Sequence, residues 1–159
     1  MDRLWAPWRS DYVSDGSPKG GCFLCAAATG EEASLVVSTD RQTVTLLNRF
    51  PYNTGHLMVA PQRHVADLVD AGDDLAAAMM VGARRAIRAA QAALNPDGFN
   101  VGVNLGAAAG ASIEHVHLHV VPRWSGDTNF MPVAGAVKVL PELLEETAER
   151  LRKAFTALD

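Results

Sequence analysis

The chain has 159 residues, of which 48% are hydrophobic and 20% are charged, and its net charge is −4. This size and composition are typical of one globular domain with a buried core. The mild negative charge argues against a broad nucleic-acid-binding surface, which needs clustered positive charge. The apolar stretches are too short to cross a bilayer, and the charged, proline-containing first residues do not resemble a signal peptide. We therefore expect a cytoplasmic protein that binds neither nucleic acid nor membrane.

Five segments have the composition of β-strands. They are rich in β-branched and aliphatic residues and are bounded by turn residues such as Pro51, Asn53 and Gly98. The first two are separated by a connection of hairpin length. The five predicted strands span approximately residues 34–38, 43–48, 55–60, 99–105 and 115–121.

Two segments have the pattern of helices. One runs from Asp73 or Asp74 to about Leu94, with one apolar stripe and with aspartates placed to supply the N-cap and the first-turn charge. The other runs from Pro141 to about Leu158, with acidic residues early and basic residues late. The element order predicts an α+β fold, in which about five antiparallel strands carry one long inserted helix and one C-terminal helix.

Three of the five histidines lie at two-residue spacing in the last predicted strand, as His115, His117 and His119. In an extended strand this spacing places the three imidazoles on one face and the intervening apolar residues on the other. Imidazole titrates near neutral pH, so such a row suits nucleophilic, acid–base or metal chemistry. The loop just before it contains Gly110 and Ser112, whose backbone and hydroxyl groups can approach an anion.

The run His-Val-His-Leu-His-Val-Val resembles the signature of the histidine triad (HIT) family, in which three histidines alternate with apolar residues. Asn48, the segment 55–61 and Asn104 are also similar to that family, and the resemblance extends over about residues 33–124. The continuation at residues 122–130 is most similar to the diadenosine polyphosphate phosphorylases of the family. At Ala111 the chain departs from the glutamine that many HIT hydrolases carry, which is compatible with phosphate as the acceptor in place of water.

The resemblance implies a nucleotide substrate and a role for each histidine. His117 would attack the α-phosphorus and form a covalent nucleotidyl–histidine intermediate. His119 would contact the phosphate oxygens, and His115 would orient its neighbour directly or through a metal. The nucleotide contacts implied by the resemblance are Asn48, Asn104, Gly110 and Ser112. For Asn48, the interpretation as a polar strand-end residue that satisfies a turn is nearly as well supported.

Cys22 and Cys25 form a Cys-x-x-Cys pair, which in a reducing compartment is not expected to be a structural disulfide. Such a pair can be redox-active, a pair of free thiols or half of a zinc site. His64 and His115 are candidates for the two remaining zinc ligands, as in some HIT proteins. Zinc would then be structural and would tie the N-terminal arm to the sheet. The remaining histidine, His56, is interpreted as a packed strand residue without a chemical role.

The expected organisation is a single HIT domain with an N-terminal arm at 1–32, a core at 33–124 and a C-terminal extension at 125–159. The resemblance also implies a homodimer in which two sheets join. Trp5, Trp8 and Tyr12 in the arm could pack across that interface or stack on a base.

Three functions stay open from the sequence. The preferred one is a hydrolase or phosphorylase of dinucleoside polyphosphates, with nucleoside phosphoramidates as the alternative substrate class. The second is a purine-nucleotide-binding signalling protein with little turnover. The third is a zinc-bound interaction module.

Overall fold

The computed structural model describes residues 21–31, 33–128 and 141–158. Its five strands form one antiparallel sheet in the order β1-β2-β3-β5-β4, which confirms the predicted α+β architecture. In chain order the elements are α2 (Phe23–Thr29), β1 (Val36–Thr39), β2 (Thr43–Leu47), β3 (Leu57–Pro61), the 3-10 helix η1 (Val69–Ala71), α3 (Asp73–Leu94), β4 (Gly98–Val103), the 3-10 helix η2 (Ala107–Ala109), β5 (Leu118–Arg123) and α5 (Leu144–Thr156).

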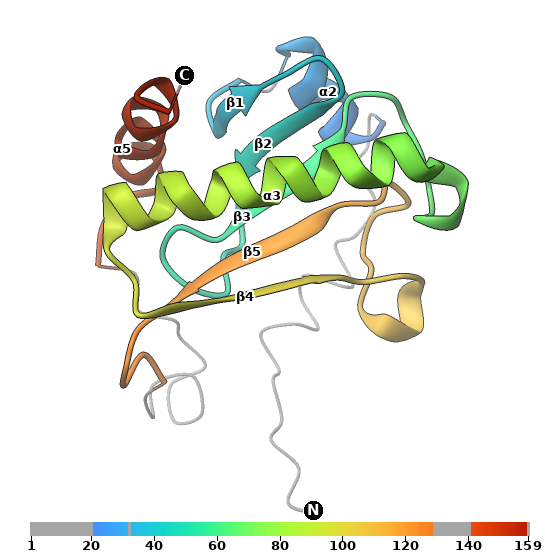
Figure 1. The fold of residues 1–159 in the computed structure, drawn as a ribbon. Coiled ribbons are helices and arrows are strands. Elements are labelled where there is room, and N and C mark those ends of the chain that lie inside the picture. The colour runs from blue at the N-terminus through green and yellow to red at the C-terminus, as the bar shows by residue number, and fades with distance from the viewer. Residues whose placement is uncertain (1–20, 32, 129–140, 159) are drawn as a thin grey trace, which may run out of the picture.

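The long helix α3 crosses one face of the sheet, and α5 packs against α3 and β1 (Figure 1). Among the described residues, no helix combines the length and apolar character that a bilayer crossing requires. The apolar stripe of α3 faces the sheet because its buried residues recur at helical spacing, as Leu75, Met79, Ala83, Ala86 and Ala90 do.

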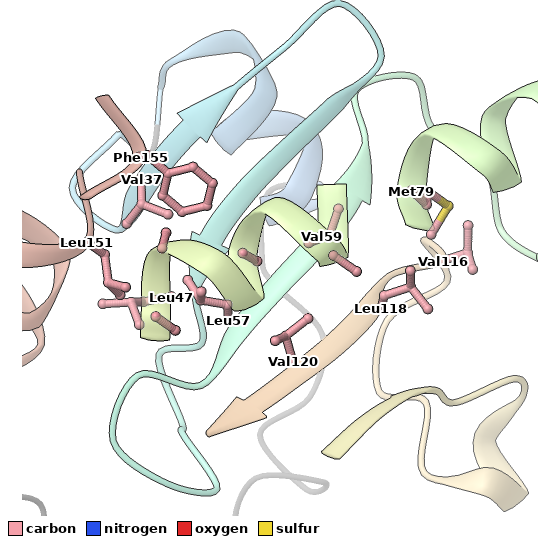
Figure 2. Packing of buried hydrophobic residues seen from close by; sticks show 14 of the residues in the cluster. Val37, Leu47, Leu57, Val59, Met79, Val116, Leu118, Val120, Leu151 and Phe155 are labelled. Carbon is pink, nitrogen blue, oxygen red and sulfur yellow. The ribbon is translucent and has the colours of Figure 1, made fainter. Parts of the chain in front are cut away.

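The main core fills the space between α3, α5 and the sheet (Figure 2). From β5 and the residues before it, Val116, Leu118 and Val120 all enter this core. This alternation confirms that the apolar partners of the histidines face α3, so the intervening positions face away from it. The opposite face of the sheet carries a smaller core, in which Leu24 of α2 packs with side chains such as Met58 of β3.

The ends of several elements differ from the sequence prediction. Asp73 and Asp74 lie in the first turn of α3, but Gly72 is its N-cap residue, with no side-chain cap. The final helix begins at Leu144, so Pro141 lies before its first turn. Helix α2 was not predicted, because its short, alanine-rich sequence has no marked apolar periodicity.

Strand β5 begins at Leu118, later than predicted, so only His119 of the three alternating histidines lies within a regular strand. The backbone N–H of Val116 donates to the carbonyl of Val65, which lies beyond the end of β3. Bonding to this irregular segment explains why the ladder starts later. The arm aromatics Trp5, Trp8 and Tyr12 lie outside the described residues.

Candidate active site and metal centre

The rings of His117 and His119 lie next to each other, with centroids 4.8 Å apart in an edge-to-face arrangement. In the sheet, His119 pairs with Met58 of β3 on one side and with Gly102 of β4 on the other. Among the described residues, no atom would lie within 4 Å of a Cβ atom added to Gly102. Gly102 therefore leaves its position in β4 uncrowded by the described part of the chain, next to His119 on the face that α3 does not cover.

The ring of His117 is held by the main chain of the residue two positions earlier. Its Nδ1–H donates to the carbonyl oxygen of His115 at 2.8 Å. In a neutral imidazole the proton on Nδ1 leaves a lone pair on Nε2. Burial lowers the pKa of His117 below its ordinary value, which favours this neutral form. His117 thus has the tautomer that a nucleophile at Nε2 requires.

His56, which was expected to be a packed residue without a role, contacts the same site. It is fully buried, and its Nε2 lies 2.9 Å from Nδ1 of His119. Its Nδ1 accepts a hydrogen bond from the backbone N–H of Tyr52 at 3.0 Å, and the Tyr52 ring stacks on it with centroids 4.6 Å apart. The prediction that it is packed is confirmed, but the contact with His119 was missed because it depends on the register between β3 and β5.

The nucleotide contacts implied by the resemblance are spread over two regions. Val103 pairs with Leu118, so Asn104 follows β4 directly beside the register position of His117. Asn48, at the end of β2, is nearly buried, and its Oδ1 accepts the backbone N–H of Phe50 at 2.9 Å. The structure thus gives Asn48 the turn-forming contact that was one of its two interpretations.

Gly110 and Ser112 lie in an exposed loop between β4 and β5. Gly110 adopts φ 89°, in the left-handed region that favours glycine, at the end of η2. The backbone N–H groups of residues 109 to 111 already donate to carbonyl oxygens inside the loop.

Cys22, Cys25, His64 and His115 come together in one cluster, as expected, although they are distant in sequence. Their ligand atoms all lie within 4.8 Å of one another. The His115 Nδ1 lies 3.2 Å from the Cys22 Sγ and 3.6 Å from the Cys25 Sγ, and the His64 Nδ1 lies 3.4 Å from the Cys25 Sγ. Around a tetrahedral zinc ion with two sulfur and two nitrogen ligands, any two ligand atoms lie about 3.3–3.8 Å apart. The four residues fit zinc in both chemistry and spacing.

The protonation of the His115 ring suits a metal ligand. The Nε2–H of His115 donates to the carbonyl of Pro61 at 3.1 Å, which leaves Nδ1 unprotonated toward the thiols. Burial, together with the nearby His64, lowers the pKa of His115 to about 4. Burial and the adjacent Cys22 thiol raise the pKa of Cys25, so metal binding would have to displace thiol protons.

Comparison with known proteins places this arrangement in a family. The model of the HIT domain matches residues 29–126. The chain is 41% identical to the AP-4-A phosphorylase of Mycobacterium tuberculosis, over 95% of its own length and 83% of the relative's length. This chain therefore belongs to the HIT family.

Two solved structures are similar to the whole architecture. A zinc-bound histidine triad family protein from Mycobacterium smegmatis has a TM-score of 0.75 and 34% identity, covering 87% of this chain and 96% of that one. A hypothetical histidine triad nucleotide-binding protein from Sulfolobus tokodaii has a TM-score of 0.73 and 25% identity, covering 86% of this chain and 93% of that one.

Proposed function

We propose that this HIT-family chain is an enzyme that cleaves dinucleoside polyphosphates through a nucleotidyl–histidine intermediate, with inorganic phosphate as the second acceptor. The observation that carries this proposal is the hydrogen bond from Nδ1–H of His117 to the carbonyl of His115, which leaves Nε2 as a nucleophile. The 41% identity to an AP-4-A phosphorylase over 95% of the chain supports phosphate as the acceptor.

In the first step, Nε2 of His117 attacks the α-phosphorus of diadenosine tetraphosphate. An N–P bond forms, and the P–O bond to the remaining polyphosphate breaks, so ATP leaves with the bonding electron pair. His117 carries the adenylyl group as a phosphoramidate. Splitting the transfer in this way replaces one difficult displacement by two easier ones.

In the second step, an oxygen of inorganic phosphate attacks the same phosphorus atom. The new P–O bond forms as the N–P bond breaks, and ADP leaves with His117 restored. The sum of the two steps is diadenosine tetraphosphate plus phosphate giving ADP plus ATP. His119 stabilises the phosphate oxygens, whose charge increases in each transition state.

We assign the nucleotide contacts to Asn48, Asn104, Gly110 and Ser112. Asn104 is supported by its register position beside His117. The Asn48 carboxamide uses Oδ1 in the turn to Phe50, and its amide hydrogens serve a ribose hydroxyl. Gly110 and Ser112 are supported by their place in the loop that leads into the three histidines.

We assign zinc to the site formed by Cys22, Cys25, His64 and His115, where it supplies a structural cross-link and no reactive group. The residues bring α2, the segment after β3 and the segment before β5 to one point. Because His115 also provides the carbonyl that holds His117, the ligand set fixes the position of the nucleophile.

We further propose that the chain is a single HIT domain and acts as a cytoplasmic homodimer. Among the described residues, β4 forms an edge of the sheet, and Val101 in it is 42% exposed. An exposed edge strand favours pairing with a second copy. The main core takes side chains from β1 to α5, which supports one domain.

The test is product analysis of diadenosine tetraphosphate incubated with and without inorganic phosphate, using the wild type and His117→Ala. We expect ADP and ATP to appear only with phosphate, and only with the wild type. AMP and ATP formed without phosphate would make the protein a hydrolase. Turnover by His117→Ala would disprove the mechanism.

Phosphoramidate turnover, nucleotide binding and zinc-dependent partner binding are measured separately to distinguish the alternatives. A protein that turns over only adenosine phosphoramidates would belong to the alternative substrate class. Tight nucleotide binding without turnover of either substrate would favour the signalling function. Partner binding that depends on zinc, without any labelled intermediate, would favour the interaction module.

A further inference from the structure

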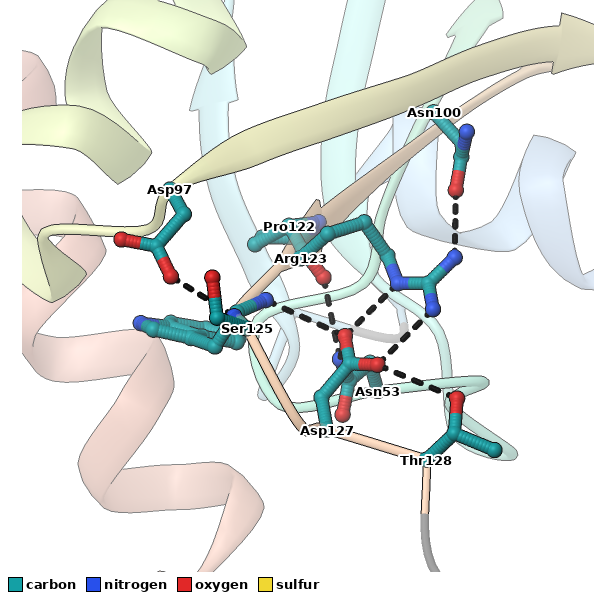
Figure 3. A network of polar contacts seen from close by, with 9 residues as sticks. Asn53, Asp97, Asn100, Pro122, Arg123, Ser125, Asp127 and Thr128 are labelled. Carbon is teal, nitrogen blue, oxygen red and sulfur yellow. Dashed lines mark hydrogen bonds and ion pairs between the residues drawn. The ribbon is translucent and has the colours of Figure 1, made fainter.

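The turn after β5 contains a carboxylate with five hydrogen bonds. Asp127 accepts from Arg123 through Nε at 2.7 Å and through Nη2 at 2.8 Å. It also accepts the backbone N–H of Trp124 at 3.1 Å and the hydroxyl of Thr128 at 3.4 Å. The fifth donor, Nδ2 of Asn53 at 2.8 Å, comes from the loop between β2 and β3 (Figure 3).

The side chain of Asn53 connects the β2–β3 loop to the turn after β5. Its Nδ2 also donates to the carbonyl of Pro122 at 3.1 Å, so its side chain is fixed on two acceptors. Its own carbonyl accepts the backbone N–H of His56 at 3.1 Å. The residue before it, Tyr52, donates its backbone N–H to Nδ1 of His56. The loop therefore contacts both the main chain and the ring of His56.

These contacts determine where the protons lie on two imidazole rings. Because the Tyr52 N–H can only donate, Nδ1 of His56 is an acceptor, and neutral His56 carries its proton on Nε2. That Nε2–H donates to Nδ1 of His119 at 2.9 Å. His119 then carries its own ring proton on Nε2, as a donor.

From this chain of contacts we infer that Asp127 is a positioning residue, which holds Asn53 and thereby sets the tautomer and orientation of His119. The inference rests on the proposed function for the role of His119 at phosphate, but the tautomer itself is a property of the resting protein. No atom of Asp127 needs to touch the substrate. Its side chain is only 11% exposed, as expected for a structural acceptor.

The ordinary structural reading is that Asp127 merely pairs with Arg123 four residues earlier. An ion pair with one exposed partner contributes little to stability because solvent screens it, and the side chain of Arg123 is 43% exposed. That reading does not require Asn53, and it predicts no change at His119. Asp97, directly before β4, provides a local control because it accepts the backbone N–H of Ser125 in this turn at 2.6 Å. Within the described part of the chain, no hydrogen bond joins the Asp97 side chain to the β2–β3 loop.

The first measurement is the tautomer of each histidine ring, read from long-range proton–nitrogen correlation spectra of nitrogen-labelled protein. In the wild type we expect both His56 and His119 to carry the proton on Nε2. In Asp127→Asn and in Asn53→Ala we expect the His119 signals to shift toward a mixture of tautomers. Asp97→Asn should give the wild-type pattern.

The second measurement is steady-state kinetics with diadenosine tetraphosphate and phosphate. A donor that is misplaced in the transition state lowers kcat more than it alters KM. We expect Asp127→Asn and Asn53→Ala to lower kcat by roughly tenfold, with KM within about twofold of the wild type. Asp97→Asn should retain wild-type kcat.

The two measurements separate the possible failures. An unchanged His119 tautomer in both variants, or kcat losses no larger than for Asp97→Asn, would overturn the positioning role. If the wild type fails to turn over diadenosine tetraphosphate, the proposed function fails, while the tautomer shift still decides the inference. If Asp127→Asn does not fold, the His119 tautomer and the kcat of Asn53→Ala test the inference.

Discussion

The ring of His117 and the carbonyl oxygen of His115 are joined by a 2.8 Å hydrogen bond in which Nδ1 donates. The same residue, His115, presents its own Nδ1 to Cys22 and Cys25. One residue thus contributes its main chain to the contact with the proposed nucleophile, His117, and its side chain to the metal cluster.

The rate of adenylyl transfer should be resistant to mild acid. His117 must be neutral at Nε2 to attack, and burial lowers the pKa of His117 below the ordinary value of about 6.5. The neutral form therefore persists as the pH falls, and the rate should decrease only below the ordinary histidine range. Rapid-quench measurement of ATP release between pH 5 and pH 8 checks this, with zinc content measured at each pH. An acid limb centred at or above about 6.5 would contradict it.

Removing one zinc ligand should lower both the zinc content and the stability of the protein. The purified wild type should contain about one zinc per chain, and Cys25→Ser should contain a small fraction of that. When the free zinc concentration is 100 to 1,000 times the dissociation constant, loss of zinc binding lowers the free energy of unfolding by about 2.7–4.1 kcal/mol. Elemental analysis and chemical denaturation check both quantities, and zinc returned to chelator-treated wild type is the control. Full zinc occupancy in Cys25→Ser would refute the assigned ligand set.

The close approach of α3 to the sheet should make Gly82 intolerant of a side chain. A Cβ atom there would lie 2.8 Å from Cγ1 of Val59 and 3.2 Å from Oγ1 of Thr43. Overpacking costs about 1–3 kcal/mol, against a helix-propensity gain of about 1 kcal/mol for alanine. We expect Gly82→Ala to be destabilised, as measured by urea unfolding. Adding Val59→Ala should recover part of the overpacking cost. If the two substitutions change the free energy of unfolding additively, the clash is ruled out.

Association through β4 should be sensitive to charge at the sheet edge. Val101 is 42% exposed on this strand, and Val69, in η1, is 86% exposed. We expect Val101→Asp to shift the proposed dimer toward monomer, because two carboxylates would approach each other at a paired edge. Val69→Asp, which introduces the same charge elsewhere, should remain dimeric. Light scattering after size-exclusion chromatography checks both, and a monomeric wild type would dismiss the proposed dimer.

Much of the fold follows from local patterns in the chain. The apolar stripe from Leu75 to Ala90 predicts a helix that covers a sheet, and the structure places it there. The alternation around His117 predicts which side chains enter the core. By contrast, α2 carries little periodic signal, and its position depends on tertiary packing of Leu24 against the sheet.

The candidate site was predictable only in part, for a similar reason. The three alternating histidines and the Cys-x-x-Cys pair are visible in the sequence, and resemblance to the HIT family linked them through His64. The contact between His56 and His119 spans 63 residues and depends on the register of two strands. The bond between Asn53 and Asp127 spans 74 residues, so no local pattern indicates it.

The carbonyl that orients His117 belongs to the peptide backbone, which every amino acid at position 115 would supply. Substituting the imidazole of His115 would remove a metal ligand but would leave an oxygen acceptor for the His117 ring. An engineer could therefore redesign the metal centre, or replace it by apolar packing, while preserving the nucleophile's tautomer. The sulfur and nitrogen ligands are in this sense an exchangeable support for a contact whose oxygen acceptor no substitution at position 115 can remove.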